Sequence, residues 1–141
     1  LILIDETDNV DYFLYKFNIS KKDQKRLKLI DNFYKEKINS KSFSLDKMNK
    51  IFYYHGKQTV IDILNYRIIK NKILDENLIN MITLFQNKDK PIMPVNADLL
   101  MTKYNIPEGK QLGIKLKSIE QEWVNNNFKI SDQQIDNIIN N

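Results

Sequence analysis

The stretch “IFYYHGKQTVIDILNYRI”, residues 51–68, contains two helical patterns on either side of a His-Gly pair. A glycine directly after the last apolar position is typical of a helix C-terminus, because glycine tolerates the backbone conformation that ends a helix. We therefore expect a tight corner at His55-Gly56, between two helices. Their apolar residues recur at helical spacing and are Leu45, Met48, Ile51 and Phe52 before the corner and Val60, Ile63, Leu64, Ile68 and Ile69 after it.

Helical spacing of apolar residues continues through most of the remaining chain. Ser20 with Asp23, and Ser131 with Gln134, have the three-residue spacing of a capping box, which marks a helix start. No segment shows the convincing alternation of a strand, so the predicted fold class is all-α with about seven helices. The expected helices cover about residues 20–38, the segment from Ser44 to the corner, residues 57–74, the segment after Asp75, residues 97–104, about 108–126, and the segment after Ser131.

Residues 88–96, “KDKPIMPVN”, contain two of the three prolines and interrupt the helical pattern. Proline removes a backbone donor and clashes with the preceding helical turn, so a helix through this segment is disfavoured. We expect a linker here, which divides the chain into a helical body, residues 1–90, and a helical tail, residues 91–141.

The composition limits the possible classes of protein. With 141 residues, 42% of them hydrophobic, the chain can bury one core or two small helical cores. The absence of cysteine excludes disulfides and thiolate metal sites. No apolar run approaches the roughly 18 to 20 residues of a membrane span, so we expect a soluble, cytoplasmic protein. The net charge of +4 comes mostly from lysine and leaves nucleic-acid binding and an ordinary solvated surface both open.

Residues suited to catalysis are few. His55 is the only histidine, and without a nucleophile or a metal-ligand spacing around it we interpret it as a capping or core residue. The densest acidic group is Asp5, Glu6 and Asp8, which we interpret as a solvated face because no third carboxylate is placed for a two-metal site. The sequence contains no phosphate-binding loop and no HExxH motif. We therefore predict no catalytic and no metal-binding residues in this chain.

The stretch “YNIPEGKQLG”, residues 104–113, places two of the three glycines in an otherwise helical pattern. Glycine inside a helix costs roughly 1 kcal/mol relative to alanine. A short helix, a proline-containing turn and a longer helix give the outline of a helix-hairpin-helix, whose exposed amides and small residues let a phosphodiester backbone approach. Alternatively, the glycines let the preceding helix pack closely. On the first interpretation the RNA-binding residues are Lys103, Gly109, Lys110, Gly113 and Lys117.

Three blocks of sequence together carry a family resemblance. They are “NISKKDQKRLKLI” (18–30), “IFYYHGKQTVIDILNYRI” (51–68) and “PVNADLLMTKYNIPEGKQLGIKLKSIEQEWVNNNF” (94–128). In content and spacing they resemble the C-terminal body and tail of bacterial tRNA nucleotidyltransferases, the CCA-adding enzymes, and their poly(A) polymerase relatives, with the alphaproteobacterial pattern nearest. The resemblance implies an all-helical region that grips the acceptor and TΨC arms of tRNA, largely through the phosphate backbone.

The third block is the most specific of the three. The chain departs from the family's tail motif where Asn96 and Ala97 stand near the position of one glycine, and where Asn105 replaces another. Asparagine tolerates a left-handed backbone, so we expect the turn at Asn105 to persist. The positions that match the motif are Asp98, Leu99, Ile106, Gly109, Leu112, Gly113, Leu116, Glu120 and Trp123.

The resemblance also implies what this sequence lacks. The family's chemistry belongs to an N-terminal head with a Gly-Ser motif and an Asp-x-Asp pair for two metal ions, and to a neck that selects CTP and ATP; none of these is in the sequence. We expect no cofactor here, with Mg²⁺ in the missing head. The chain alone is then an inactive, RNA-holding part of a nucleotidyltransferase, either a fragment or a split-gene product. Its expected partners are tRNA and a nucleotidyltransferase head.

Two other classes stay open, as do CCA addition and poly(A) addition. A helical protein-interaction module without RNA binding would have the same helices, and a DNA-binding helix-hairpin-helix protein would account for the tail alone. The salt dependence of tRNA binding distinguishes RNA binding from these classes. If phosphate contacts hold the tRNA, its affinity falls steeply as salt increases.

Overall fold

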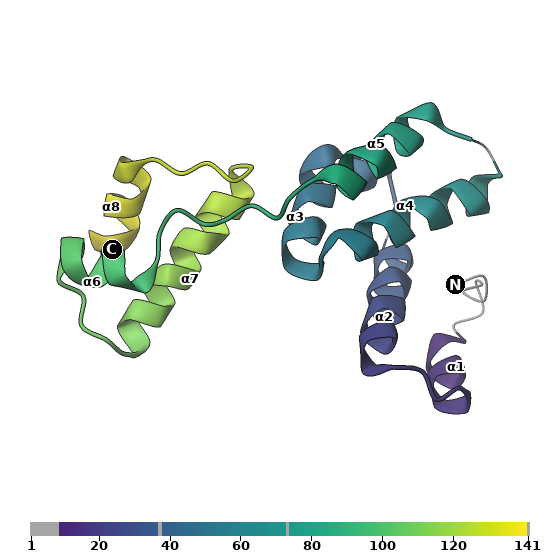
Figure 1. The fold of residues 1–141 in the computed structure, drawn as a ribbon, viewed down its shortest axis with the longest axis horizontal. Helices are drawn as coiled ribbons and strands as arrows, with labels where there is room; N and C mark the ends of the chain where they lie inside the picture. Colours follow the sequence, from purple (N-terminus) through teal and green to yellow (C-terminus); the bar gives the residue numbers. More distant parts are fainter. Residues whose placement is uncertain (1–8, 37, 73, 141) are drawn as a thin grey trace. The chain divides into compact units, whose positions relative to one another are not determined.

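The computed structural model describes residues 9–36, 38–72 and 74–140, and every regular element in these ranges is helical (Figure 1). The predicted all-α class is therefore confirmed. None of the helices described is both long and apolar enough to cross a bilayer. The elements are α1 (Val10–Lys16), α2 (Lys21–Lys35), the 3₁₀ helix η1 (Ser40–Phe43), α3 (Leu45–His55), α4 (Lys57–Asn71), α5 (Glu76–Asn87), α6 (Ala97–Tyr104), α7 (Lys110–Asn125) and α8 (Asp132–Asn140).

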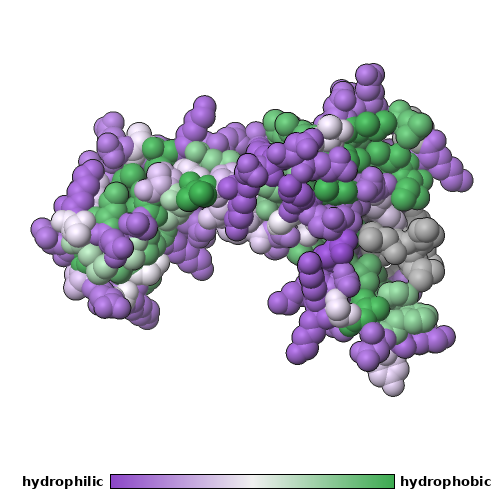
Figure 2. All heavy atoms as spheres, in the orientation of Figure 1, coloured by the Kyte–Doolittle hydropathy of each residue, from purple (hydrophilic) through white to green (hydrophobic). Residues whose placement is uncertain are grey.

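The chain forms two compact units, unit 1 (Leu1–Asp89) and unit 2 (Lys90–Asn141), which are described separately. Each has its own buried apolar cluster. Figure 2 shows mainly hydrophilic side chains on the visible surface, with apolar patches over α4 and α5 in unit 1. Exposed apolar side chains of unit 1 include Ile69 on α4, Leu84 on α5 and Leu74 between these helices.

Local capping explains where most helices begin. The Ser44 side chain accepts a hydrogen bond from the Lys47 amide at 3.3 Å, as expected for the start of α3. Gly56, with φ of +85°, ends α3 and begins α4 directly, which confirms the predicted corner. Helix α1 was not among the expected helices. It spans only seven residues, and its cap residue Asn9 makes no side-chain capping bond. The burial of Val10 in the core of unit 1 stabilises it instead.

The core of unit 1 joins α2, α3, α4 and α5. The rings of Phe52 on α3 and Phe85 on α5 lie 5.5 Å apart between centroids. Just after α5, the Lys88 ammonium donates to Asn49 Oδ1 at 2.6 Å and lies over the Phe85 ring. Burial lowers the pKa of Lys88. The first residue of the predicted linker is thus held on unit 1. Fully buried apolar residues of this core are Ile30, Met48, Val60, Ile63, Leu64 and Phe85.

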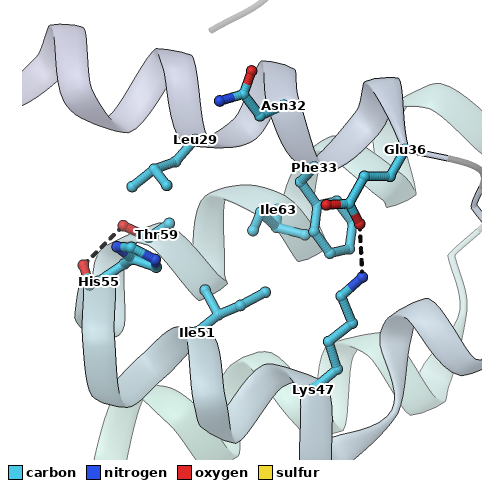
Figure 3. Close-up of a pocket in the computed structure, with 9 residues that line it drawn as sticks. All are labelled: Leu29, Asn32, Phe33, Glu36, Lys47, Ile51, His55, Thr59 and Ile63. Atoms are coloured by element: carbon cyan, nitrogen blue, oxygen red, sulfur yellow. Dashed lines mark hydrogen bonds and ion pairs between the residues drawn. The ribbon is translucent and has the colours of Figure 1, made fainter. Parts of the chain in front are cut away.

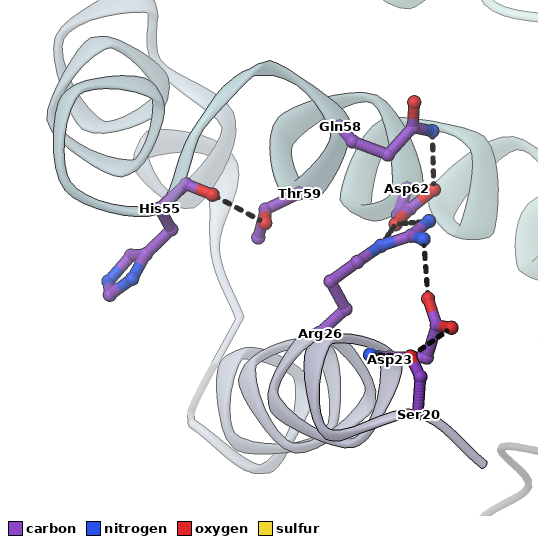
Figure 4. Close-up of polar contacts among 7 residues, drawn as sticks. All are labelled: Ser20, Asp23, Arg26, His55, Gln58, Thr59 and Asp62. Carbon is purple, nitrogen blue, oxygen red and sulfur yellow. Dashed lines mark hydrogen bonds and ion pairs between the residues drawn. The ribbon is translucent and has the colours of Figure 1, made fainter.

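An ion pair joins α2 to α4, 36 residues apart in sequence (Figure 4). Arg26 Nε donates to Asp62 Oδ2 at 2.9 Å, and Arg26 Nη1 donates to Asp23 Oδ1 at 2.9 Å. The other Asp62 oxygen accepts from Gln58 Nε2 at 3.0 Å. The Asp62 side chain is only 6% exposed, and a carboxylate buried this far is costly unless it is paired and hydrogen-bonded. The hydrogen bond to Asp62 raises the pKa of Arg26.

Unit 2 packs α6, α7 and α8 around a smaller core. Asn105 adopts the expected left-handed conformation, with φ of +53°, and ends α6. The Asn96 side chain accepts a hydrogen bond from the Leu99 amide at 2.9 Å, so asparagine caps α6 where the family has a glycine nearby. Tyr104 Oη donates to Asp136 at 2.6 Å and ties α6 to α8. Buried apolar residues of this core are Val95, Leu100, Leu112, Ile119 and Ile135.

Arg26→Leu is expected to destabilise the protein by about 3 kcal/mol, because the buried Asp62 carboxylate loses its charged donor. The double variant Arg26→Leu/Asp62→Leu is expected to be more stable than Arg26→Leu, because it leaves no unpaired buried charge. Urea denaturation followed by circular dichroism measures both. An Arg26→Leu variant as stable as the wild type would mean that water satisfies Asp62 in place of the arginine.

Candidate nucleic-acid interface

The turn between α6 and α7 lies on the surface of unit 2. Gly109 is the N-cap of α7, whereas the sequence predicted it inside the first turn of a helix from about residue 108. It has φ of +146°, a conformation that side chains rarely permit. A Cβ added at Gly109 would meet nothing within 4 Å, and the same holds for Gly113. The interpretation that these glycines allow close packing of the preceding helix is therefore wrong. At Gly109 the backbone conformation of the turn requires glycine.

The N-terminus of α7 is open to solvent. The glycine cap supplies no side-chain hydrogen bond, and Gly109, Lys110 and Gln111 are all exposed. The first amides of a helix have no partner within the helix, and together with the helix dipole they create positive potential. This is an arrangement that attracts anions.

Two predicted lysines extend this positive region along α7. Lys110 and Lys117 are both exposed, and their seven-residue separation places them within about 20° around the helix and about 10 Å apart along it. Gly113, also exposed, lies between them in sequence and within about 60° of Lys110 around the helix. We call these three residues the α7 strip. The structure thus brings together four of the five predicted residues at one helix start and along one helix face.

Lys103 has a different environment. Its ammonium lies 3.6 Å from the Asp132 carboxylate of α8 and 5.1 Å from the centre of the Tyr104 ring. A side-chain hydrogen bond with Tyr104, followed by the charge of Asp132, raises the pKa of Lys103. Part of its charge is therefore compensated within unit 2, although half of the side chain stays exposed.

Unit 1 contains a basic pocket that the sequence analysis did not find. It has a volume of about 550 Å³ and lies between α2 and the α3–α4 corner. A sequence signal was present, because the tripeptide Gly-Lys-Gln occurs at residues 56–58 and again at 109–111, directly at two helix starts. The residues that line the basic pocket are Lys22, Lys25, Arg26, Leu29, Tyr54, His55, Gly56, Lys57, Gln58 and Thr59.

A neighbouring cavity of about 180 Å³ has more apolar residues in its lining (Figure 3). Its polar contacts include an ion pair in which Lys47 Nζ lies 3.0 Å from Glu36 Oε2. His55 lines both cavities, and its main-chain carbonyl accepts a hydrogen bond from Thr59 Oγ1 at 3.0 Å, which helps to close the corner. Leu29, Phe33, Ile51 and Ile63 supply the apolar lining.

The sequence predicted no metal-binding residues, and this stays a prediction. Asp5, Glu6 and Asp8 lie outside the described residues. Within the described ranges, no three histidine or acidic side chains are grouped so that they could hold a metal ion. The α7 strip offers lysine ammonium groups beside helix-start amides, and the basic pocket offers cations, helix-start amides, the His55 imidazole and the Tyr54 ring.

Comparisons of the chain with protein-family models, with curated proteins and with solved structures found no match in any of the three.

Proposed function

We propose that this chain is the RNA-binding C-terminal part of a tRNA nucleotidyltransferase that adds CCA to tRNA 3′ ends, or of a poly(A) polymerase of the same family. The observation that carries the proposal is the start of α7, where a glycine cap leaves exposed amides beside Lys110. The family resemblance of residues 94–128 supports it, because Gly109 and Gly113 fall on the family's tail motif.

The α7 strip suits contact with a nucleic-acid backbone. Amides at a helix start and lysine ammonium groups bind phosphate oxygens and do not read base edges. An A-form RNA stem is recognised mainly through its shape, phosphates and 2′-hydroxyls, since its deep major groove is closed to side chains. A surface of this chemistry is therefore expected to hold tRNA by its backbone, with little dependence on sequence.

Nucleotide addition needs groups beyond those of the α7 strip. Phosphoryl transfer depends on metal ions that neutralise the charge developing on the phosphates and orient the attacking hydroxyl. In the family this role belongs to carboxylates of the head, with Mg²⁺ as the metal. We therefore assign to this chain the holding of the tRNA and to a separate head the chemistry.

A second candidate function is a helical protein-interaction module. Helix α1 and the residue after it expose aromatic side chains, with Tyr12 64%, Tyr15 90% and Phe17 47% exposed. Aromatic residues are enriched at protein interfaces. A chain that ignores tRNA but binds a separately expressed nucleotidyltransferase head would favour this second function.

The wild-type chain is expected to bind tRNA that lacks its CCA end, with an affinity that falls steeply as salt increases. Lys110→Glu/Lys117→Glu is expected to weaken binding at least about tenfold and to reduce the slope of log affinity against log salt by about 1 to 2. Fluorescence anisotropy with labelled tRNA at several salt concentrations measures both quantities.

Matched variants separate the α7 strip from general charge effects. Lys103→Glu is expected to weaken binding less than Lys110→Glu, because Asp132 already compensates Lys103. Glu108→Gln, which removes an exposed acid beside the glycine cap, is expected to strengthen binding. Equal effects of Lys103→Glu and Lys110→Glu would contradict the assignment of the site to the start of α7. Equal competition by duplex DNA would favour the DNA-binding alternative.

Gly113→Ala is expected to raise the stability of the free protein by about 1 kcal/mol, because alanine is the better helix former and its Cβ meets open space. The same change is expected to weaken tRNA binding, because the added methyl group lies where the RNA backbone approaches. Thermal unfolding and anisotropy measure the two effects, with Asn137→Ala, exposed on α8, as the control. A stabilised Gly113→Ala variant with unchanged affinity would remove Gly113 from the site.

The purified chain is expected to add no nucleotides to tRNA lacking its CCA end in the presence of CTP, ATP and Mg²⁺. The physical reason is that the sequence has no Asp-x-Asp pair of the kind that holds the two metal ions in the family. Denaturing gel electrophoresis of end-labelled tRNA measures extension, with a complete CCA-adding enzyme as the positive control. Robust addition by this chain would overturn the assignment of the chemistry to a separate head.

A further inference from the structure

The basic pocket of unit 1 concentrates lysine charge, and the two acidic residues beside it, Asp23 and Asp62, pair with Arg26. Four cationic residues line it, and none of the described residues that line it is acidic. Like charges brought together in one cavity repel each other, and a bound anion relieves that repulsion. Within the described ranges neither Lys22 nor Lys25 forms an ion pair, although Lys22 interacts electrostatically with Asp23, so both ammonium groups can donate hydrogen bonds to a ligand.

Arg26 positions this charge. Its guanidinium is already engaged with Asp62 and Asp23, as Figure 4 shows, so it fixes α2 against α4 more than it serves a ligand. Lys22 and Lys25 lie one turn apart on the same face of α2. The ion pair therefore holds both lysines beside the start of α4.

The start of α4 adds amide donors. Gly56 caps α4 without a side-chain hydrogen bond, and Lys57 and Gln58, which carry the first amides of the helix, line the pocket. Lys57 Nζ donates to the Gln86 carbonyl at 2.7 Å, which holds the ammonium near the end of α5 and leaves two of its protons for other acceptors. Amides at a helix start favour an anion through both hydrogen bonding and the helix dipole.

An aromatic ring completes the pocket. Tyr54 is 51% exposed and lines the same cavity as the lysines. Its ring packs edge-on against Tyr53, with 5.1 Å between centroids, so its orientation is supported from one side. Lysines beside an exposed aromatic ring match a nucleotide unit, whose phosphate meets the cations and whose base or ribose meets the ring.

We propose that the basic pocket binds a phosphate group of an RNA strand, as a backbone contact of unit 1 in addition to the α7 strip of unit 2. The inference rests on the proposed function, because it takes RNA as the source of the phosphate. A free nucleotide offers the same phosphate chemistry, so the experiment includes CTP and ATP as separate probes.

The test compares Lys22→Glu/Lys25→Glu with Lys41→Glu/Lys72→Glu, which makes the same charge change at exposed positions of unit 1 outside the pocket. The pocket variant is expected to lose at least about tenfold in tRNA affinity and to reduce the salt slope by about 1 to 2, while the control loses less than about threefold. Circular dichroism confirms that both variants are folded. In ¹H–¹⁵N NMR spectra, a short oligoribonucleotide is expected to shift the Lys57 and Gln58 amides of the wild type but not of the pocket variant.

The outcomes distinguish this inference from the proposed function. A wild type that binds tRNA, with pocket and control variants equally affected, overturns the pocket and leaves the α7 strip intact. Unshifted Lys57 and Gln58 amides on saturation with the oligoribonucleotide have the same meaning. Shifts produced by CTP or ATP at lower concentration than by RNA overturn RNA as the ligand. A wild type that binds no tRNA overturns the proposed function and this inference together.

Discussion

The ion pair between Arg26 and Asp62 is the constraint on which the arrangement of unit 1 depends. A carboxylate as buried as Asp62 needs charged and hydrogen-bonding partners, and Arg26 and Gln58 supply them. Because Arg26 lies on α2 and Asp62 on α4, satisfying the carboxylate fixes the register of the two helices. The lysines of α2 then face the α3–α4 corner. The pairing that the buried Asp62 carboxylate needs therefore also forms the basic pocket.

Units 1 and 2 each contain a helix that begins after a glycine cap. In each, a glycine with positive φ begins a helix without a side-chain cap, and Lys-Gln follows it directly. Gly56 is the single residue between α3 and α4, whereas Gly109 ends a longer turn after α6. In both, a Cβ would meet open space, so the glycines serve backbone conformation and leave the amides uncovered.

Local signals in the sequence predicted most helices, and long-range contacts account for what was missed. The caps at Ser44 and Ser131 and the left-handed Asn105 act within a few residues, and all three occur as expected. Helix α1 depends on the burial of Val10 against residues distant in sequence, so no local pattern marks it. The α7 strip lies on one helix and could be predicted from spacing. The basic pocket combines residues of α2 and α4, whose proximity only the folded chain supplies.

Anion binding at the uncapped starts of α4 and α7 would couple folding to binding. A helix whose first amides have no internal acceptor frays more readily at that end. A phosphate bound there would act as an external cap, so ligand occupancy would suppress fraying and raise the melting temperature of the unit that holds it. Positive φ at Gly56 and Gly109 disfavours the serine or aspartate that caps other helices, because a Cβ is strained in that conformation. The backbone of each turn therefore leaves these amides without a side-chain cap and open to an external acceptor.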